Sequence, residues 1–172
     1  MTFAGINKKY LIPNTPNRAM QDLSKFSFGA TSAVTSSLAL MIGLNPLGVP
    51  KLGIIGALLV IAFADNIADS LGMHIYAESK SKGHAKLNTV TNYLTRLGIT
   101  LLMIAFVVVL PLPYAIAASI IFGLVVMAVL SYLIAKTHNM NPAQVVAEHL
   151  TVTILILVAS QLIGSSISAL LG

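Results

Sequence analysis

Two carboxylates and a thioether recur every four residues within a long apolar segment. Asp65, Asp69 and Met73 fall in residues 52–76, which read LGIIGALLVIAFADNIADSLGMHIY. The i, i+4, i+8 spacing places the three side chains along one face of a helix. Carboxylate oxygens suit hard or borderline divalent cations, and a thioether adds a soft ligand. This set predicts a site for Fe²⁺, Mn²⁺, Co²⁺ or Zn²⁺ rather than for Mg²⁺ or Ca²⁺.

The acidic pair is predicted to lie deep in a membrane. Asp65 follows Leu52 by 13 residues, which is about 20 Å of helix, and a bilayer core is about 30 Å thick. A charge at that depth costs at least about 2.5 kcal/mol unless it is paired, hydrated or bound to a cation. The alternative is structural: the acids are protonated or hydrogen-bond to Ser and Thr of a neighbouring span, and Met73 fills the core.

Further polar side chains are candidates for lining a cation path. Ser32 and Ser36 lie one turn apart in the first apolar segment and can face the acidic pair, or they can serve close helix packing. Glu148 and His149 lie near the start of the last helix, where they form either a station for cation uptake and release or a solvated interfacial pair. His74 is interpreted as an interfacial residue.

Composition determines the class of protein that must position these residues. Of the 172 residues, 56% are hydrophobic and 9% are charged, whereas a soluble domain carries about 25% charged residues. We therefore predict an all-α integral membrane protein. A polar segment at residues 1–25 holds a short interfacial helix beginning at Thr15-Pro16. A membrane domain at residues 26–172 holds five spans, at about 26–44, 52–76, 93–110, 114–135 and 145–171.

Basic residues alternate between the ends of these spans. They concentrate before span 1 and between spans 2 and 3, where Lys80, Lys82 and Lys86 accompany His84. The positive-inside rule then places the N-terminus in the cytoplasm and the C-terminus outside or in a lumen. We expect a cell membrane rather than a vacuolar membrane, contact with membrane lipid, and no nucleic-acid binding despite the net charge of +5.

Small and capping residues predict local packing. Gly29, Ala33 and Ser37 form a small-residue ridge on span 1, and Ser160, Gly164 and Ser168 form another on span 5, suited to helix packing or dimerisation. Arg96 lies near the start of the predicted span 3, so we expect its side chain to snorkel to the interface. Asn141-Pro142 is predicted to cap the last helix.

The acidic segment and span 1 together resemble the vacuolar iron transporter family. Family span 1 often reads FGSTDGLVTTFALVAGL, and residues 28–44 here read FGATSAVTSSLALMIGL without a gap. Family span 2 carries an acidic residue eight positions before a Met, often in a string like LIADALSM; here Asp65 stands eight before Met73, and residues 66–73 read NIADSLGM. The Pro-Leu-Pro turn after span 3 also fits, and the resemblance covers about residues 26–171.

This resemblance implies a homodimer of five-span chains with the pathway at or near the subunit interface. It also implies Fe²⁺ or Mn²⁺ moving out of the cytosol in exchange for protons. Two departures stand out: the family's span 1 acid falls on Ser32, and its Glu-rich cytoplasmic helices between spans 2 and 3 are replaced by a basic loop. The nodulin-like branch of the family also lacks those helices.

Taken together, the residues and the resemblance predict a proton-coupled exporter of a divalent metal, Fe²⁺ or Mn²⁺. Asp65, Asp69 and Met73 would hold the metal, Ser32 and Ser36 would line the path, and Glu148 would serve at one end. The alternatives are a transporter of a different solute on the same scaffold and a membrane scaffold protein that transports nothing. We expect no cofactor. The sequence has no Walker loop, GxGxxG turn or serine-hydrolase elbow, so we expect no enzymatic activity.

Overall fold

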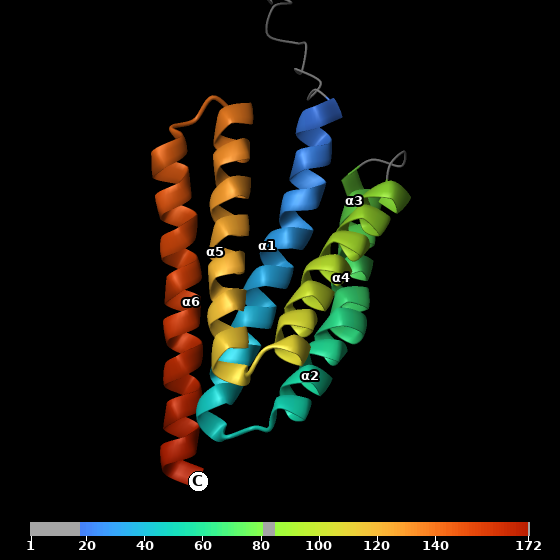
Figure 1. Ribbon diagram of the computed structural model, residues 1–172. Coiled ribbons are helices and arrows are strands. Elements are labelled where there is room, and N and C mark those ends of the chain that lie inside the picture. The colour runs from blue at the N-terminus through green and yellow to red at the C-terminus, as the bar shows by residue number, and fades with distance from the viewer. Residues whose placement is uncertain (1–17, 81–84, 172) are drawn as a thin grey trace, which may run out of the picture.

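The computed structural model describes residues 18–80 and 85–171, which form a bundle of helices (Figure 1). Residues 1–17 of the predicted polar segment 1–25, with the start of the interfacial helix, and the basic loop around Lys82 and His84 lie outside the described residues. The α-helices are α1 (Arg18–Leu44), α2 (Lys51–Val60), α3 (Asn66–Lys80), α4 (Ala85–Val109), α5 (Leu112–Thr137) and α6 (Pro142–Leu171). A 3-10 turn, Asn45–Leu47, follows α1, and a π turn, Ile61–Asp65, joins α2 to α3.

Five helical segments among the described residues are long and apolar enough to cross a membrane. They are Phe26–Leu47, Lys51–Tyr76, Thr89–Val109, Leu112–Thr137 and Pro142–Leu171. The helical class and the five spans are thereby confirmed; the side on which each end of the chain lies stays a prediction. From Arg18 onward α1 runs without a break into the first span.

The second span contains a π turn where the sequence predicts one continuous helix. A regular α-helix turns about 100° per residue, so Ser70, sixteen residues after Ile54, would lie about 160° away around the axis. A π turn absorbs about one residue and reduces that angle to about 60°. One buried face therefore continues through the junction, consisting of Ile54, Leu58, Ala62, Asn66 and Ser70.

Helix α1 lies between α4 on one side and α5 and α6 on the other (Figure 1). The Gly29–Ala33–Ser37 ridge packs against α4: a Cβ at Gly29 would stand 2.9 Å from the Asn92 carbonyl oxygen, Ala33 and Ser37 are fully buried, and the Ser37 hydroxyl lies 3.5 Å from that of Thr100. Small side chains let two membrane helices approach closely. The ridge on span 1 thus serves intrachain packing.

The closest approach of α1 and α6 occurs at a pair of glycines. A Cβ on Gly164 would lie 2.1 Å from the carbonyl oxygen of Gly43, a separation that no side chain can occupy. Ser160 of the same small-residue stripe also faces Gly43, with its carbonyl oxygen 3.5 Å from the position of a Gly43 Cβ. The middle of the stripe on α6 is therefore covered within the chain.

Two apolar clusters hold the helices together. One joins α1, α2, α4 and α5 around Met41, Leu58 and Val107, and the other joins α1, α4, α5 and α6 around Leu38 and Met103.

Side chains satisfy backbone groups at two helix ends. The predicted cap on α6 is confirmed, because Asn141 Oδ1 accepts a hydrogen bond of 3.1 Å from the Ala143 amide. Lys51 Nζ donates to the Val108 carbonyl oxygen at 2.9 Å and so satisfies the end of α4.

Candidate cation site

The acidic pair of span 2 converges on one arginine. Arg96 of α4 donates from Nη2 to Asp65 Oδ2 at 2.5 Å and from Nη1 to Asp69 Oδ2 and to Ser32 Oγ. Ser32 on α1 in turn donates to Asp69 Oδ2 at 3.5 Å. Three helices therefore meet at a cluster that we call the acid–arginine site: Asp65, Asp69, Arg96 and Ser32.

The expectation that Arg96 snorkels to the interface was wrong. Its side chain is only 2% exposed, and α4 begins at Ala85, with an apolar span that starts at Thr89 rather than near residue 93. Arg96 therefore lies 11 residues inside the helix, about 16 Å from its start at about 1.5 Å per residue. A guanidinium that is buried within the bundle beside two carboxylates pairs with them rather than reaching the interface. The sequence did carry a signal for this pairing: the predicted span 2 holds two acidic residues, and the predicted span 3 that follows it holds an arginine.

The burial of the three charges is unequal. The Asp65 side chain is 52% exposed and the Asp69 side chain 35%, whereas Arg96 is almost completely covered. The carboxylates thus line an open side of the cluster, and the guanidinium closes it from within. With both acids ionised the site carries one positive and two negative charges. That leaves a net charge of −1, which a single proton neutralises.

The π turn sets the direction of the acidic pair. The π turn ends at Asp65, so Asp65 and Asp69 lie one above the other on the same face of the helix that continues as α3. Asn66 continues the buried face of α2. Asn66 Nδ2 donates to the Tyr93 carbonyl oxygen at 3.0 Å and so ties α3 to α4 within one turn of Arg96. Single π turns inside helices occur frequently at functional sites.

A buried polar layer surrounds the acid–arginine site. Asn92 Nδ2 donates to Ser70 Oγ at 3.4 Å, one turn before Arg96 on α4. Within the part of the chain that the structure describes, Asn66 Oδ1, Asn92 Oδ1 and Arg96 Nε make no hydrogen bond although they are buried. Unpartnered buried polar atoms cost about 1–3 kcal/mol each. A layer with several of them favours a functional role over a purely structural one.

The structure brings some of the predicted site residues together and leaves others apart. Asp65, Asp69 and Ser32 meet at Arg96. Met73 lies one turn beyond Asp69 on α3 and is half-buried. The Ser36 hydroxyl donates to the Ser32 carbonyl oxygen at 2.6 Å, so its hydrogen is engaged within α1.

Glu148 lies far from this cluster. It is exposed on α6 and accepts a hydrogen bond of 2.8 Å from Gln144 of the same helix. Helices α6 and α3 stand on opposite sides of the bundle (Figure 1). A role for Glu148 would therefore be at a different place on the surface from the acidic pair.

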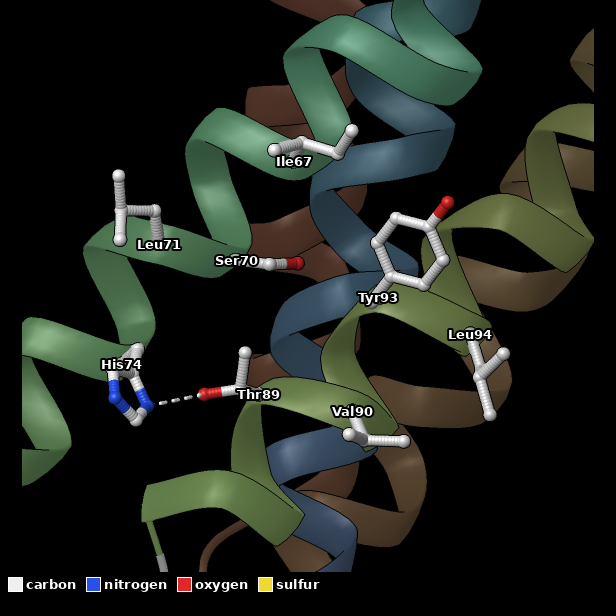
Figure 2. Close-up of a pocket in the computed structure, with 8 residues that line it drawn as sticks. All are labelled: Ile67, Ser70, Leu71, His74, Thr89, Val90, Tyr93 and Leu94. Atoms are coloured by element: carbon white, nitrogen blue, oxygen red, sulfur yellow. Dashed lines mark hydrogen bonds between the residues drawn. The ribbon is translucent and has the colours of Figure 1, made fainter.

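His74 takes part in a separate contact between α3 and α4. Its Nδ1 lies 3.3 Å from Thr89 Oγ1 (Figure 2). Its Nε2 lies 3.2 Å from Glu78 Oε1. It lines a cavity of about 540 Å³ whose remaining wall is mostly apolar, formed by Ile67, Ser70, Leu71, Thr89, Val90, Tyr93 and Leu94. This cavity offers a surface to apolar chains and few ligands to a metal.

The described residues contain no group of three or more His, Cys, Asp or Glu side chains close enough to share a metal ion. The acid–arginine site supplies two carboxylates and one hydroxyl, and a guanidinium already engages them. Chemically, such a site can hold a cation, exchange a proton, or lock three helices together by charge. Comparison of the chain with protein-family models, curated proteins and solved structures finds no match.

Proposed function

We propose that this protein is a proton-coupled cation transporter whose transport site is Asp65 and Asp69, with a divalent metal, Fe²⁺ or Mn²⁺, as its substrate. The observation that carries the proposal is the acid–arginine site itself. Two partly exposed carboxylates in a membrane-spanning segment face one buried guanidinium, and their charges do not balance. Intramembrane ionisable residues commonly mark ion pathways.

In the proposed mechanism the acid–arginine site stays electrically neutral at each step. In the resting state Arg96 holds both carboxylates, and one proton on the pair brings the site to zero. A divalent cation that engages both carboxylates neutralises them without Arg96, so it must displace both the guanidinium and the proton. Release of the metal lets Arg96 return and the pair take up a proton again. Arg96 thereby acts as a tethered counter-cation, and metal and proton move in opposite senses.

Two further arguments support a metal substrate and its direction. The motifs shared with the vacuolar iron transporter family include the acidic pair and the Met one turn later. The distribution of Lys and Arg predicts a cytoplasmic N-terminus, and the resemblance implies that the metal moves out of the cytosol. A homodimer would cover the open side of the acid–arginine site, as the resemblance implies.

Flux through reconstituted protein tests this proposal. We expect Fe²⁺ or Mn²⁺ uptake into proteoliposomes to depend on a pH gradient and to be lost in Asp65→Asn and in Asp69→Asn. Glu78→Gln is the matched control, because Glu78 is an exposed carboxylate on the same helix that contacts His74 instead of Arg96. Competition by Co²⁺ and by small organic cations, guanidinium among them, distinguishes a metal transporter from a transporter of another cation.

The ion pairs favour one other function, that of a membrane scaffold. Arg96 and Ser32 engage both acids, and such a charge lock can serve only to hold α1, α3 and α4 in register. A scaffold would show no flux of either metal or of the organic cations, and the Asp→Asn variants would change only stability. Flux that persists unchanged in both Asp→Asn variants would refute transport through this pair.

A further inference from the structure

A second cavity lies on the other side of α1 from the acid–arginine site, and its mostly apolar wall carries a group of polar side chains. It occupies about 500 Å³ between α1, α5 and α6, in the half of the bundle nearer the start of α6. Ligand pockets in proteins typically enclose about 300–1,000 Å³. Apolar side chains, Phe28 and Val152 among them, form most of its wall, and hydroxyl groups from all three helices together with His149 form the rest.

Three of these hydroxyls already donate their hydrogen atom to a backbone carbonyl oxygen of the same helix. Thr35 donates to the Thr31 carbonyl oxygen at 2.8 Å, Ser131 to that of Met127 at 2.6 Å, and Thr153 to that of His149 at 2.8 Å. A hydroxyl has one hydrogen and two lone pairs. Each of the three can therefore offer a ligand only an acceptor.

Counting the hydrogen of Ser131 in the same way assigns the tautomer of His149. Its Nδ1 lies 2.8 Å from Ser131 Oγ. Because the Ser131 hydrogen points to the Met127 carbonyl, the imidazole must supply the hydrogen of this second bond. Nδ1 is then protonated, and the neutral ring keeps its lone pair on Nε2. The imidazole is thus a fourth acceptor lining the cavity.

We propose that this cavity binds an aliphatic amine, with its N–H groups donating to the hydroxyl oxygens and to His149 Nε2, and its carbon chain lying against Phe28 and Val152. The polar part of the wall offers acceptors, and it is matched by a ligand whose head brings several donors. An ammonium or amine head supplies two or three N–H groups. An acyl chain supplies none, so it would leave the polar part of the wall unmatched. This site is independent of the function proposed for the acidic pair.

Cysteine protection tests the proposal directly, because the chain has no cysteine of its own. Val152→Cys places one thiol at the cavity, and Val158→Cys, on the same helix and with similar exposure, places one away from it. The probe is n-octylamine added to the full chain in nanodiscs. At about ten times its dissociation constant, it should slow maleimide labelling of Val152→Cys about tenfold and leave Val158→Cys unchanged.

Two comparisons make the result specific. Trimethyloctylammonium has the same chain and charge without an N–H, and octanol is neutral with one O–H; neither should protect. Adding Thr153→Val and His149→Ala to Val152→Cys should abolish protection by octylamine. Equal protection by all three probes would mean that the cavity takes apolar chains and would overturn the proposal. So would equal slowing at Val158→Cys, protection that survives the added substitutions, or no protection at all.

Discussion

Replacing Arg96 with Gln is the most informative perturbation of this protein. The substitution removes the guanidinium that bonds Asp65, Asp69 and Ser32, and it leaves two carboxylates facing each other without their cation. With both acids ionised, the formal charge of the site changes from −1 to −2. Both stability and metal affinity should respond, in opposite directions.

The expected loss of stability follows from the burial of the site. Breaking a buried ion pair by removing one partner typically costs about 3–5 kcal/mol. Asp65 is 52% exposed and Asp69 35%, so the two carboxylates left behind are not fully buried within the chain. We therefore expect a loss of about 2–3 kcal/mol, because exposed pairs contribute at most about 1 kcal/mol. For a chain of this size that is about 5–10 °C in Tm.

Thermal unfolding of purified protein in one detergent measures this effect. Arg96→Lys keeps the charge but loses the fork that engages both carboxylates, so it should recover only part of the loss. In the background of Asp65→Asn and Asp69→Asn, Arg96→Gln should cost much less, because no unpaired carboxylate remains. A double-mutant cycle over these variants isolates the coupling energy.

Addition of Mn²⁺ distinguishes two roles of Arg96: a cation that competes with the metal for the carboxylates, and a purely structural ion-pair partner. If Arg96 competes with the substrate, Mn²⁺ should raise the Tm of Arg96→Gln more than that of the native protein, and the added Asp→Asn changes should remove the shift. The reasoning would be refuted if Arg96→Gln were as stable as the native protein, or if it lost equal stability with and without the two acids. Absence of any Mn²⁺ shift in Arg96→Gln would count against competition for a metal.

Two other substitutions test the packing that positions the site. Gly164→Ala should cost about 2 kcal/mol by forcing α6 away from Gly43, since overpacking typically costs about 1–3 kcal/mol; Gly72→Ala, where a Cβ meets open space, should cost nothing in the same unfolding assay. Asn66→Ala removes the hydrogen bond to the Tyr93 carbonyl oxygen and should cost about 1 kcal/mol. An Asn66→Ala protein of native Tm would show that this bond does not hold α3 against α4.

The sequence by itself determined the membrane class and the five spans. A bilayer core requires about 20 apolar residues per helix, a local property of the chain that needs no partner. The sequence also determined that Asp65 and Asp69 share one helix face, since residues four apart lie on one side of a helix.

Only the tertiary structure decided what the acidic pair faces. Arg96 is 31 residues from Asp65 and 27 from Asp69, and no local pattern fixes which helices become neighbours. Arg96 was predicted to lie at an interface, and its packing against the neighbouring spans that carry Ser32 and the acidic pair makes it a buried residue instead. The π turn and the Gly43–Gly164 contact likewise depend on how the helices pack. The physical reason is that membrane helices associate through the fit of their surfaces, which an apolar sequence pattern leaves open.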